Sequence, residues 1–236
     1  TTSRVIRIYV ATNGEPLSGG IPVSQTNWSV AITNLIVPSS GNATVVWQSV
    51  DGVTYDLYSS AQPLGAGASW SKVVSAQEAE GASATASVSA ASSNIYYQVV
   101  PQGQSTLNRG VWGIVRPTIP SAFHLMSPPV LGDRSFADDG AFGQALAAAV
   151  PEGAKIHIAT DAAPNWITLE QIGGVWRTDP DTQEYTTPLA AGQAFYLQGA
   201  SGAYPVFVGP VGNQGTQSVD LAVGFNLLGV SDGKGM

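Results

Sequence analysis

This chain of 236 residues has no cysteine and only two histidines, and 11% of its residues are charged. Without cysteine it has no disulfide framework and no thiolate to act as a nucleophile or metal ligand. His124 and His157 lie far apart in the sequence, which argues against a zinc site, since zinc needs several His and Cys ligands. Ordinary soluble domains have about 25% charged residues, so the low charge content needs an explanation.

Basic residues and long apolar runs are also scarce. Nine Lys and Arg residues are scattered along the chain, and the formal net charge is −7. Nucleic-acid binding needs clustered basic side chains to neutralise phosphates, so we expect no nucleic-acid partner. No apolar run approaches the ~20 residues that a membrane-spanning helix requires, so we expect no membrane span.

The residues that are abundant indicate an ordered protein made of strands. The hydrophobic fraction of 44% is sufficient for real cores, which argues against disorder. The length favours two domains. The first residue is Thr1 rather than Met; removal of a signal peptide would explain this, and so would trimming of the chain. Low charge with many Ser, Thr, Asn and Gln favours an extracellular or cell-surface location.

Alternating apolar residues predict a β-sandwich in the first half of the chain. Asp51-Gly52 is a strong hairpin signal, because a type I′ turn needs positive φ at both central residues. Short strands at regular spacing are typical of a sandwich. The expected strands are Ser29–Val37, Thr44–Val50, Val53–Ser59, Trp70–Ser75, Ala82–Ala90 and Ile95–Val100.

Residues 42–103 carry a more specific pattern. It combines Trp47, the Asp51-Gly52 turn, Tyr55, Trp70 and the closing strand Ile95-Tyr-Tyr-Gln-Val99. The pattern resembles the fibronectin-type-III-like modules of bacterial secreted proteins. The resemblance implies an Ig-like sandwich in which Trp47, Tyr55, Trp70 and Tyr97 are buried, but no particular activity. Gln98 departs from it, because these modules usually have Arg there; we expect the change to remove a surface charge.

The complete expectation is an all-β chain with two β-sandwich-like domains, the second with one short helix. The helix is expected near 138–150, capped by Asp138 or Asp139 and stopped by Pro151 and Gly153. Further strands are expected at Val111–Val115, Lys155–Ala159, Trp166–Ile172, Gly174–Arg177, Gln193–Gln198, Tyr204–Val208 and Ser218–Val223. The domain ranges are 1–28 (N-terminal strand and linker), 29–103 (sandwich), 104–120 (connector) and 121–236 (second β-rich domain).

A short internal similarity links Ala122–Met126 to Gly224–Leu228, both of the form F-x-L-(M/L). The two copies are either paired strands of one domain or the openings of two successive modules, and chance similarity is a third explanation.

No catalytic, cofactor-binding or metal-binding residue is predicted. His157 lies in Lys155-Ile-His-Ile, where alternation puts it beside Lys155 and opposite the isoleucines, and no nucleophile motif accompanies it. Asp179, Asp181 and Glu184 have the oxygen-rich character of a calcium loop but lack its glycine and length. An acidic turn is the simpler interpretation, and calcium binding is left open. We therefore expect a protein that is not an enzyme.

Six tryptophans suggest carbohydrate binding as an alternative, because exposed aromatic rings stack on sugars. Trp47 and Trp70 belong to the expected sandwich core. Trp166 and Trp176 flank the Gly173-Gly174 turn and could share one face of a hairpin, which makes them candidates for glycan stacking. Burial in the core is the competing interpretation.

The leading hypothesis is an extracellular structural protein, the subunit of a surface filament or layer. Ser3–Val10 is apolar on both faces and would add to a neighbour's sheet edge, making a homo-oligomer. Pairing within its own domain is the alternative. The candidate interface residues are Val5, Ile6, Ile8, Tyr9 and Val10. The other hypotheses are a surface adhesin or carbohydrate-binding module, and a non-catalytic accessory fragment of a secreted enzyme.

Overall fold

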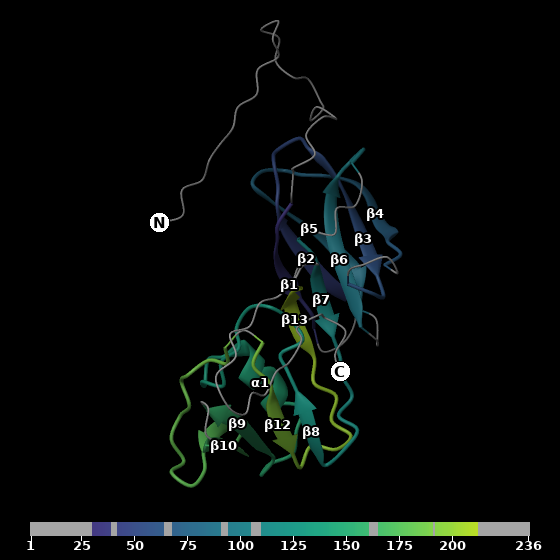
Figure 1. The fold of residues 1–236 in the computed structure, drawn as a ribbon. Helices are drawn as coiled ribbons and strands as arrows, with labels where there is room; N and C mark the ends of the chain where they lie inside the picture. The colour runs from purple at the N-terminus through teal and green to yellow at the C-terminus, as the bar shows by residue number, and fades with distance from the viewer. Residues whose placement is uncertain are drawn as a thin grey trace, which may run out of the picture.

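The computed structural model describes residues 30–38, 42–63, 68–90, 94–104, 110–160, 165–190 and 192–211. These residues form three antiparallel sheets and one short helix, which confirms the all-β class (Figure 1). Ser3–Val10 and Ser218–Val223 lie outside the described residues. So do Trp28 and Gly224–Leu228, the second copy of the internal similarity.

The first sheet has the order β1-β2-β5, and each strand has one buried face. Side chains alternate between the two faces of a strand, and the sequences follow that period: in β2 the buried residues are Ala43, Val45 and Trp47. The strands are β1 (Ile32–Ile36), β2 (Asn42–Gln48) and β5 (Ser83–Ser89).

The second sheet packs against the first and has the order β13-β7-β6-β3-β4. Its strands are β3 (Thr54–Ser60), β4 (Ser71–Glu78), β6 (Ile95–Pro101), β7 (Trp112–Val115) and β13 (Phe207–Pro210). β7 comes from the stretch expected to be a connector, and β13 comes from the expected second domain. Every residue of β7 pairs with β13, from Val115 with Phe207 to Trp112 with Pro210.

A core between these two sheets contains three of the four aromatic residues expected there. Trp47 is 0% exposed, and Tyr55 and Tyr97 are each 1% exposed. Trp70 is a correction: it is only partly buried and packs against the other core. Gln98 is a second correction, because it is 2% exposed and so does not lie at the surface. It follows Tyr97, whose side chain enters the sandwich core, so alternation turns Gln98 to the opposite, covered face of β6.

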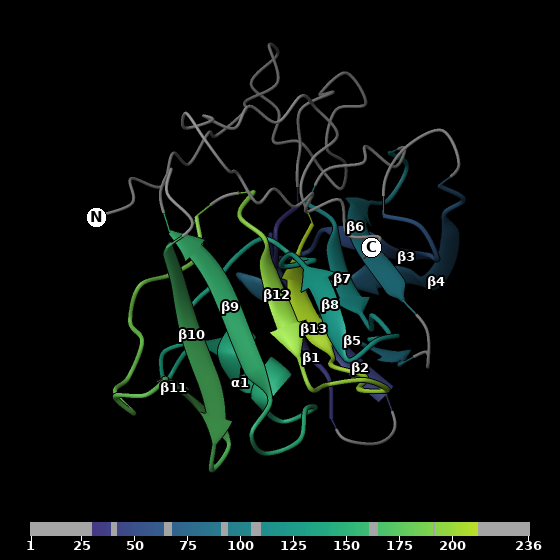
Figure 2. The same ribbon diagram turned by 60° about the horizontal axis from the view of Figure 1, so that its bottom comes forward.

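The third sheet has the order β11-β10-β9-β12-β8 and carries the helix on one face (Figure 2). Its strands are β8 (Phe123–Met126), β9 (Lys155–Thr160), β10 (Asn165–Ile172), β11 (Val175–Thr178) and β12 (Phe195–Gln198). The helix α1 (Ala141–Ala147) packs its buried residues Phe142 and Leu146 into the second core.

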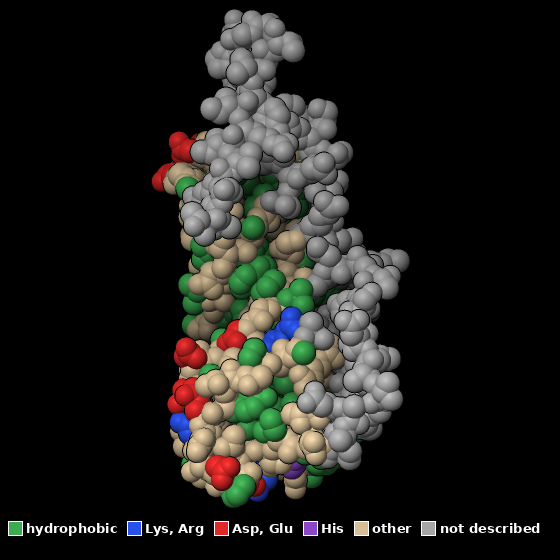
Figure 3. All heavy atoms as spheres, turned by 60° about the vertical axis from the view of Figure 1, so that its left-hand side comes forward, with side chains coloured by type: hydrophobic (Ala, Val, Ile, Leu, Met, Phe, Trp, Pro, Cys, Tyr) green, Lys and Arg blue, Asp and Glu red, His purple; other side chains and the backbone are tan. Residues whose placement is uncertain are grey.

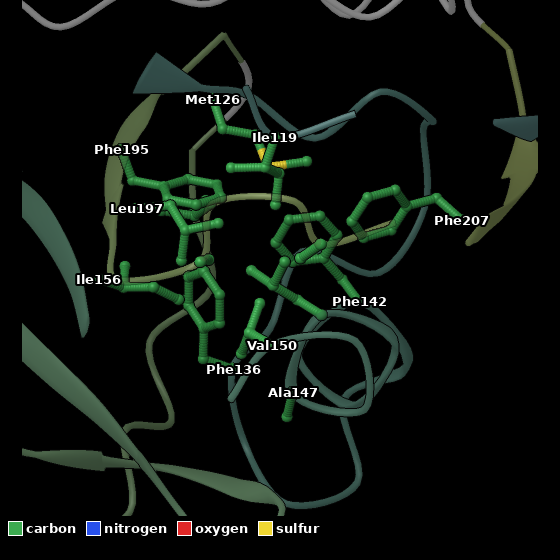
Figure 4. Packing of buried hydrophobic residues seen from close by; sticks show 14 of the residues in the cluster. Ile119, Met126, Phe136, Phe142, Ala147, Val150, Ile156, Phe195, Leu197 and Phe207 are labelled. Atoms are coloured by element: carbon green, nitrogen blue, oxygen red, sulfur yellow. The ribbon is translucent and has the colours of Figure 1, made fainter. Parts of the chain in front are cut away.

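Several aromatic rings contact one another within this second core (Figure 4). Phe136 lies edge-on to Phe142, Trp176 and Phe195, at 5.4–6.0 Å between ring centroids. Phe207 of β13 stacks on Phe142 at 5.0 Å. The next residue, Val208, packs against the sandwich core. β13 therefore contributes to both cores, and the sheet containing it joins the two halves of the molecule.

The helix differs from the expectation at its start. Its N-cap is Gly140, which makes no side-chain capping bond, so neither Asp138 nor Asp139 caps it. Instead the Ala141 N–H donates to the carboxylate of Asp133, eight residues earlier in the chain. The Asp138 carboxylate is instead engaged by Arg177 on β11.

Candidate functional site

The strongest candidate site lies on the face of the third sheet opposite α1. Ile156 and Ile158 of β9 enter the core beside the helix, while the alternate residues Lys155 and His157 point to the other side. This arrangement of β9 was expected from its alternation. Among the described residues, neither the helix nor another sheet covers this second face (Figure 2), which we call the open face.

The open face carries aromatic rings in mutual contact. Trp166 of β10 lies 6.0 Å from Tyr196 of β12, and Tyr196 stacks on Phe123 of β8 at 4.7 Å with an interplanar angle of 20°. Phe123 lies 5.9 Å from the ring of His157. We call these four residues the aromatic row. Phe123 is 52% exposed and Trp166 is 40% exposed, so large aromatic surface faces solvent.

Strand register brings these rings together from distant parts of the chain. Tyr196 pairs with His157 on one side and with Leu125 on the other, and Gln198 pairs with Phe123. Directly paired residues have their side chains on the same face of the sheet. Phe123 of β8, His157 of β9 and Tyr196 of β12 therefore all lie on the open face. Because the sheet is antiparallel and its order departs from the sequence order, segments as distant as 123 and 196 become neighbours.

His157 is held in place by two uncharged partners. Its Nδ1 lies 3.1 Å from Thr168 Oγ1, and its Nε2 lies 2.8 Å from Gln198 Oε1. A Gln oxygen only accepts, so Nε2 must be the donor, and the Thr168 hydroxyl can donate to Nδ1. Both ring nitrogens therefore have a partner, and the imidazole is held between β10 and β12.

The basic residues of β9 and β11 form ion pairs. Lys155 Nζ is 2.6 Å from Asp179 Oδ2 and 3.5 Å from Glu170 Oε2, and Asp179 raises the pKa of Lys155 above its usual value. Arg177 makes a two-pronged contact with Asp138 at 2.6 and 2.8 Å. That contact lowers the pKa of Asp138 and raises the pKa of Arg177.

The two tryptophans named as candidates for glycan stacking have different surroundings. Trp166 is exposed on the open face, but Trp176 is 1% exposed in the second core, where its indole N–H donates to the Gly143 carbonyl at 2.9 Å. Trp176 therefore agrees with the competing interpretation, burial in the core. The two-residue turn pairs Trp176 with Gln171, and Gln171 lies five residues from Trp166, on the opposite face of β10. Alternation of side chains on both sides of the Gly173-Gly174 turn predicts that Trp166 and Trp176 lie on opposite faces of the sheet.

The sequence patterns did not identify Tyr196 or Phe123 as site residues. Phe123 lies within the internal similarity, and Tyr196 lies within an expected strand. Period-2 alternation places Tyr196 opposite Phe195 and Leu197, which are buried. Alternation thus predicts that Tyr196 faces outward, but it does not show which other strands present aromatic rings beside it.

The other candidate residues do not converge on a site. His124 points away from the open face, because its neighbours Phe123 and Leu125 occupy that face. Asp179 pairs with Lys155, and Glu184 accepts a bond from the Asp138 N–H. Among the described residues, no group of three or more His, Cys, Asp or Glu is arranged to hold a metal ion. Val5, Ile6, Ile8, Tyr9 and Val10 lie outside the described residues.

Comparison with known proteins adds no further identification. No family model, no curated protein and no solved structure matches this chain. In the described part of the chain, no helix is long and apolar enough to cross a membrane. The candidate site therefore depends on its geometry alone.

Proposed function

We propose that this chain is an extracellular, non-catalytic protein that binds a polysaccharide on its open face. The observation that supports the proposal is the contact series Trp166–Tyr196–Phe123, with rings from three different strands partly open to solvent. Soluble proteins seldom leave large aromatic rings clustered at the surface without a ligand or partner.

Sugar rings match this surface chemically. A pyranose ring has C–H groups that pack flat against an aromatic ring, and hydroxyls that need hydrogen-bond partners. The open face provides both kinds of group, because Thr168, His157 and Gln198 lie among the aromatic rings. Since the rings come from β10, β12 and β8, the surface extends across the sheet. An extended polymer can contact all three rings at once, whereas a monosaccharide cannot.

The absence of catalysis is part of the proposal. A glycosidase needs two carboxyl groups on either side of the scissile bond. On the open face, the carboxylates of Glu170 and Asp179 both form ion pairs with Lys155. Both ring nitrogens of His157 contact uncharged side chains, so this histidine lacks the carboxylate partner of a catalytic triad.

The test is a binding measurement on three alanine variants, W166A, Y196A and F123A, using a panel of insoluble and soluble polysaccharides. Each variant should stay folded and bind at least tenfold more weakly, which corresponds to about 1.4 kcal/mol. Tyr204→Ala is the matched control, because Tyr204 is an aromatic residue that is 66% exposed and outside the aromatic row. Equal affinity in all four variants, or no binding by the parent protein, would contradict the proposal.

Self-assembly through sheet edges is a second candidate function, and one observation favours it. Strand β5 has the sequence SATASVS, with no charged residue and no proline over seven residues. It pairs in unbroken register with β2, and among the described residues no strand pairs with its outer side. Exposed edges in natural proteins are commonly protected by charges, prolines or bulges, and β5 has none of these.

Two other edge strands of the sandwich are less suited to pairing. β4 carries Lys72 and Glu78, and its register with β3 is interrupted twice. β1 has five residues and a register shift between Ile32 and Asn34. β5 is therefore the better acceptor for an added strand, such as Ser3–Val10 of a second molecule.

The assembly candidate is tested by measuring molar mass over a range of concentrations. The double variant Thr85→Lys with Ser87→Lys puts charge on the β5 edge and should reduce assembly. The control, Asn42→Lys with Gln48→Lys on β2 inside the same sheet, should not. Deletion of residues 1–12 should abolish assembly without unfolding if that strand is donated. A parent protein that stays at 24.3 kDa would contradict this candidate.

The extracellular location and the similarity to fibronectin-type-III-like modules are also proposals. The similarity is supported by the face-to-face packing of β1-β2-β5 on the β6-β3-β4 part of the second sheet. The location is supported by the low charge content, which leaves much hydrophobic and uncharged polar surface on the side drawn in Figure 3.

A further inference from the structure

The charges on the open face are already paired within the protein. Among the described strand residues, two basic side chains lie on this face: Lys155 and Arg177, each of which is the register partner of Glu170. The Lys155 ammonium lies 2.6 Å from one carboxylate and 3.5 Å from another. Arg177 directs two guanidinium nitrogens at Asp138. Neither cation is available to an incoming acidic group without losing a partner.

The carboxylates outnumber the cations around this surface. Lys155 and Arg177 are paired with three acidic side chains, namely Asp179, Glu170 and Asp138, the last of which precedes α1 and neutralises Arg177, so that the excess of carboxylate on the open face lies around Lys155. The whole chain also has a net charge of −7. A polyanion approaching the aromatic row would therefore meet a slightly negative rim on a negative protein, and like charges brought together at an interface cost free energy.

The groups between the rings are uncharged hydrogen-bonding groups. Thr168 and Gln198 are uncharged and contact the imidazole of His157 from opposite sides. A hydroxyl and an amide both donate and accept, which suits sugar hydroxyls. They offer no charge-assisted contact of the kind that Arg and Lys make with carboxylate or sulfate.

We infer that the open face selects an uncharged polysaccharide and discriminates against polyuronates and sulfated glycans. This inference rests on the proposed polysaccharide binding and specifies its ligand class. Binding then depends on ring stacking and neutral hydrogen bonds, both of which are short-range. Salt screens interactions between exposed charges, so affinity for the correct ligand should be nearly independent of ionic strength.

The test compares a neutral oligomer, cellohexaose or mannohexaose, with oligogalacturonate of similar length by titration calorimetry on the intact chain. We expect at least one neutral oligomer to bind at least tenfold more tightly than the anionic one. Its affinity should change less than about twofold between about 0.01 M and about 1 M salt, where the Debye length falls from 30 to 3 Å. Trp166→Ala should abolish this binding, and Tyr204→Ala should not.

A charge variant separates this inference from the binding proposal itself. Glu170→Gln removes one carboxylate beside Lys155 while keeping the shape of the side chain. It should leave neutral binding unchanged and improve oligogalacturonate binding about two- to fivefold at low salt. Tight, salt-sensitive binding of oligogalacturonate that still requires Trp166 would overturn the selection for an uncharged polysaccharide. It would still support polysaccharide binding on the open face. Failure of all the oligomers to bind would overturn both.

Discussion

Trp47 has no exposed surface, and it lies edge-on to Tyr55 at 6.1 Å between ring centroids. Replacing it with Ala removes this contact and leaves a cavity, so the free energy of unfolding should fall by about 3–5 kcal/mol. Chemical denaturation measures the change. The exposed control Tyr204→Ala should change it by less than about 0.5 kcal/mol. A loss below about 1 kcal/mol for Trp47→Ala would show that the core tolerates the cavity.

Asp56 predicts a pH dependence. Burial raises its pKa, but the Lys72 ammonium at 2.6 Å and the Ala76 N–H outweigh this, so its pKa is below the ordinary value. A carboxyl group with a lowered pKa stabilises the fold above its unfolded pKa of about 3.9, and that contribution is lost as the pH falls through the folded pKa.

Asp56→Asn should therefore reduce the free energy of unfolding by about 2 kcal/mol at pH 7. The difference between the parent and the variant should shrink as the pH falls below about 4. Urea denaturation at several pH values tests this. A difference that stays constant down to pH 2 would mean that the Asp56 charge contributes nothing.

At the scale of the element, α1 contains a glycine that its packing requires. A Cβ on Gly143 would lie 2.8 Å from the Phe136 Cα and 2.9 Å from the Ser135 carbonyl oxygen. In an open helix, Gly→Ala stabilises by roughly 0.5–1 kcal/mol. Here we expect Gly143→Ala to destabilise by about 1–3 kcal/mol through overpacking, measured by thermal or chemical denaturation. A gain in stability would show that α1 can move away from Phe136.

The helix start gives a second prediction at this scale. The carboxylate of Asp133 accepts bonds from the Ala141 and Ser135 N–H groups. Asp133→Ala should therefore cost about 1 kcal/mol, a typical value for loss of a helix cap. Asp139→Ala is the control and should change stability by less than about 0.5 kcal/mol. If the two variants rank in the reverse order, capping by Asp139 would be the correct description.

The strands were predictable because each depends on a local pattern, whereas the site depends on register. Alternation identified β9 and β10, and it placed Lys155 and His157 on the same face. The neighbours of His157 on β12 and β8 follow from the sheet order, which local patterns do not encode. The predicted cap is wrong for a similar reason. Asp138 and Asp139 are closer in sequence to the helix start than Asp133, but Arg177 of another strand engages Asp138, and the Ala141 N–H donates to Asp133.

At the scale of the whole molecule, the least predictable feature is the pairing of β7 with β13 across the expected connector at 104–120. Val111–Val115 was expected as an isolated short strand, and nothing local indicates that residues near 207 pair with it. In the structure, Ile114 is completely buried in the sandwich core, and Val208 packs beside it. A strand of four residues has too short a sequence pattern to indicate which strand it pairs with. The pairing of β7 with β13 is therefore seen only in the structure.

A fragment of residues 30–104 should therefore not be a stable domain. It would lack β7 and β13 and would expose Tyr96, which is 1% exposed in the whole chain. We expect the fragment to show no cooperative thermal transition, while the whole chain shows one. Independent folding of 30–104, with stability equal to that of the longer chain, would restore a simple two-domain description.

The pairing of β13 with β7 also has a consequence for the order of events during synthesis. β7 is complete at Val115, but its partner strand begins only at Phe207. At translation rates of about 5–20 residues per second, the ribosome needs roughly 5–20 s to supply the missing strand. During that interval the edge of β7 is unpaired, and such edges are sites of aggregation. The newly made chain is therefore expected to be most vulnerable, and most dependent on chaperones, between these two points.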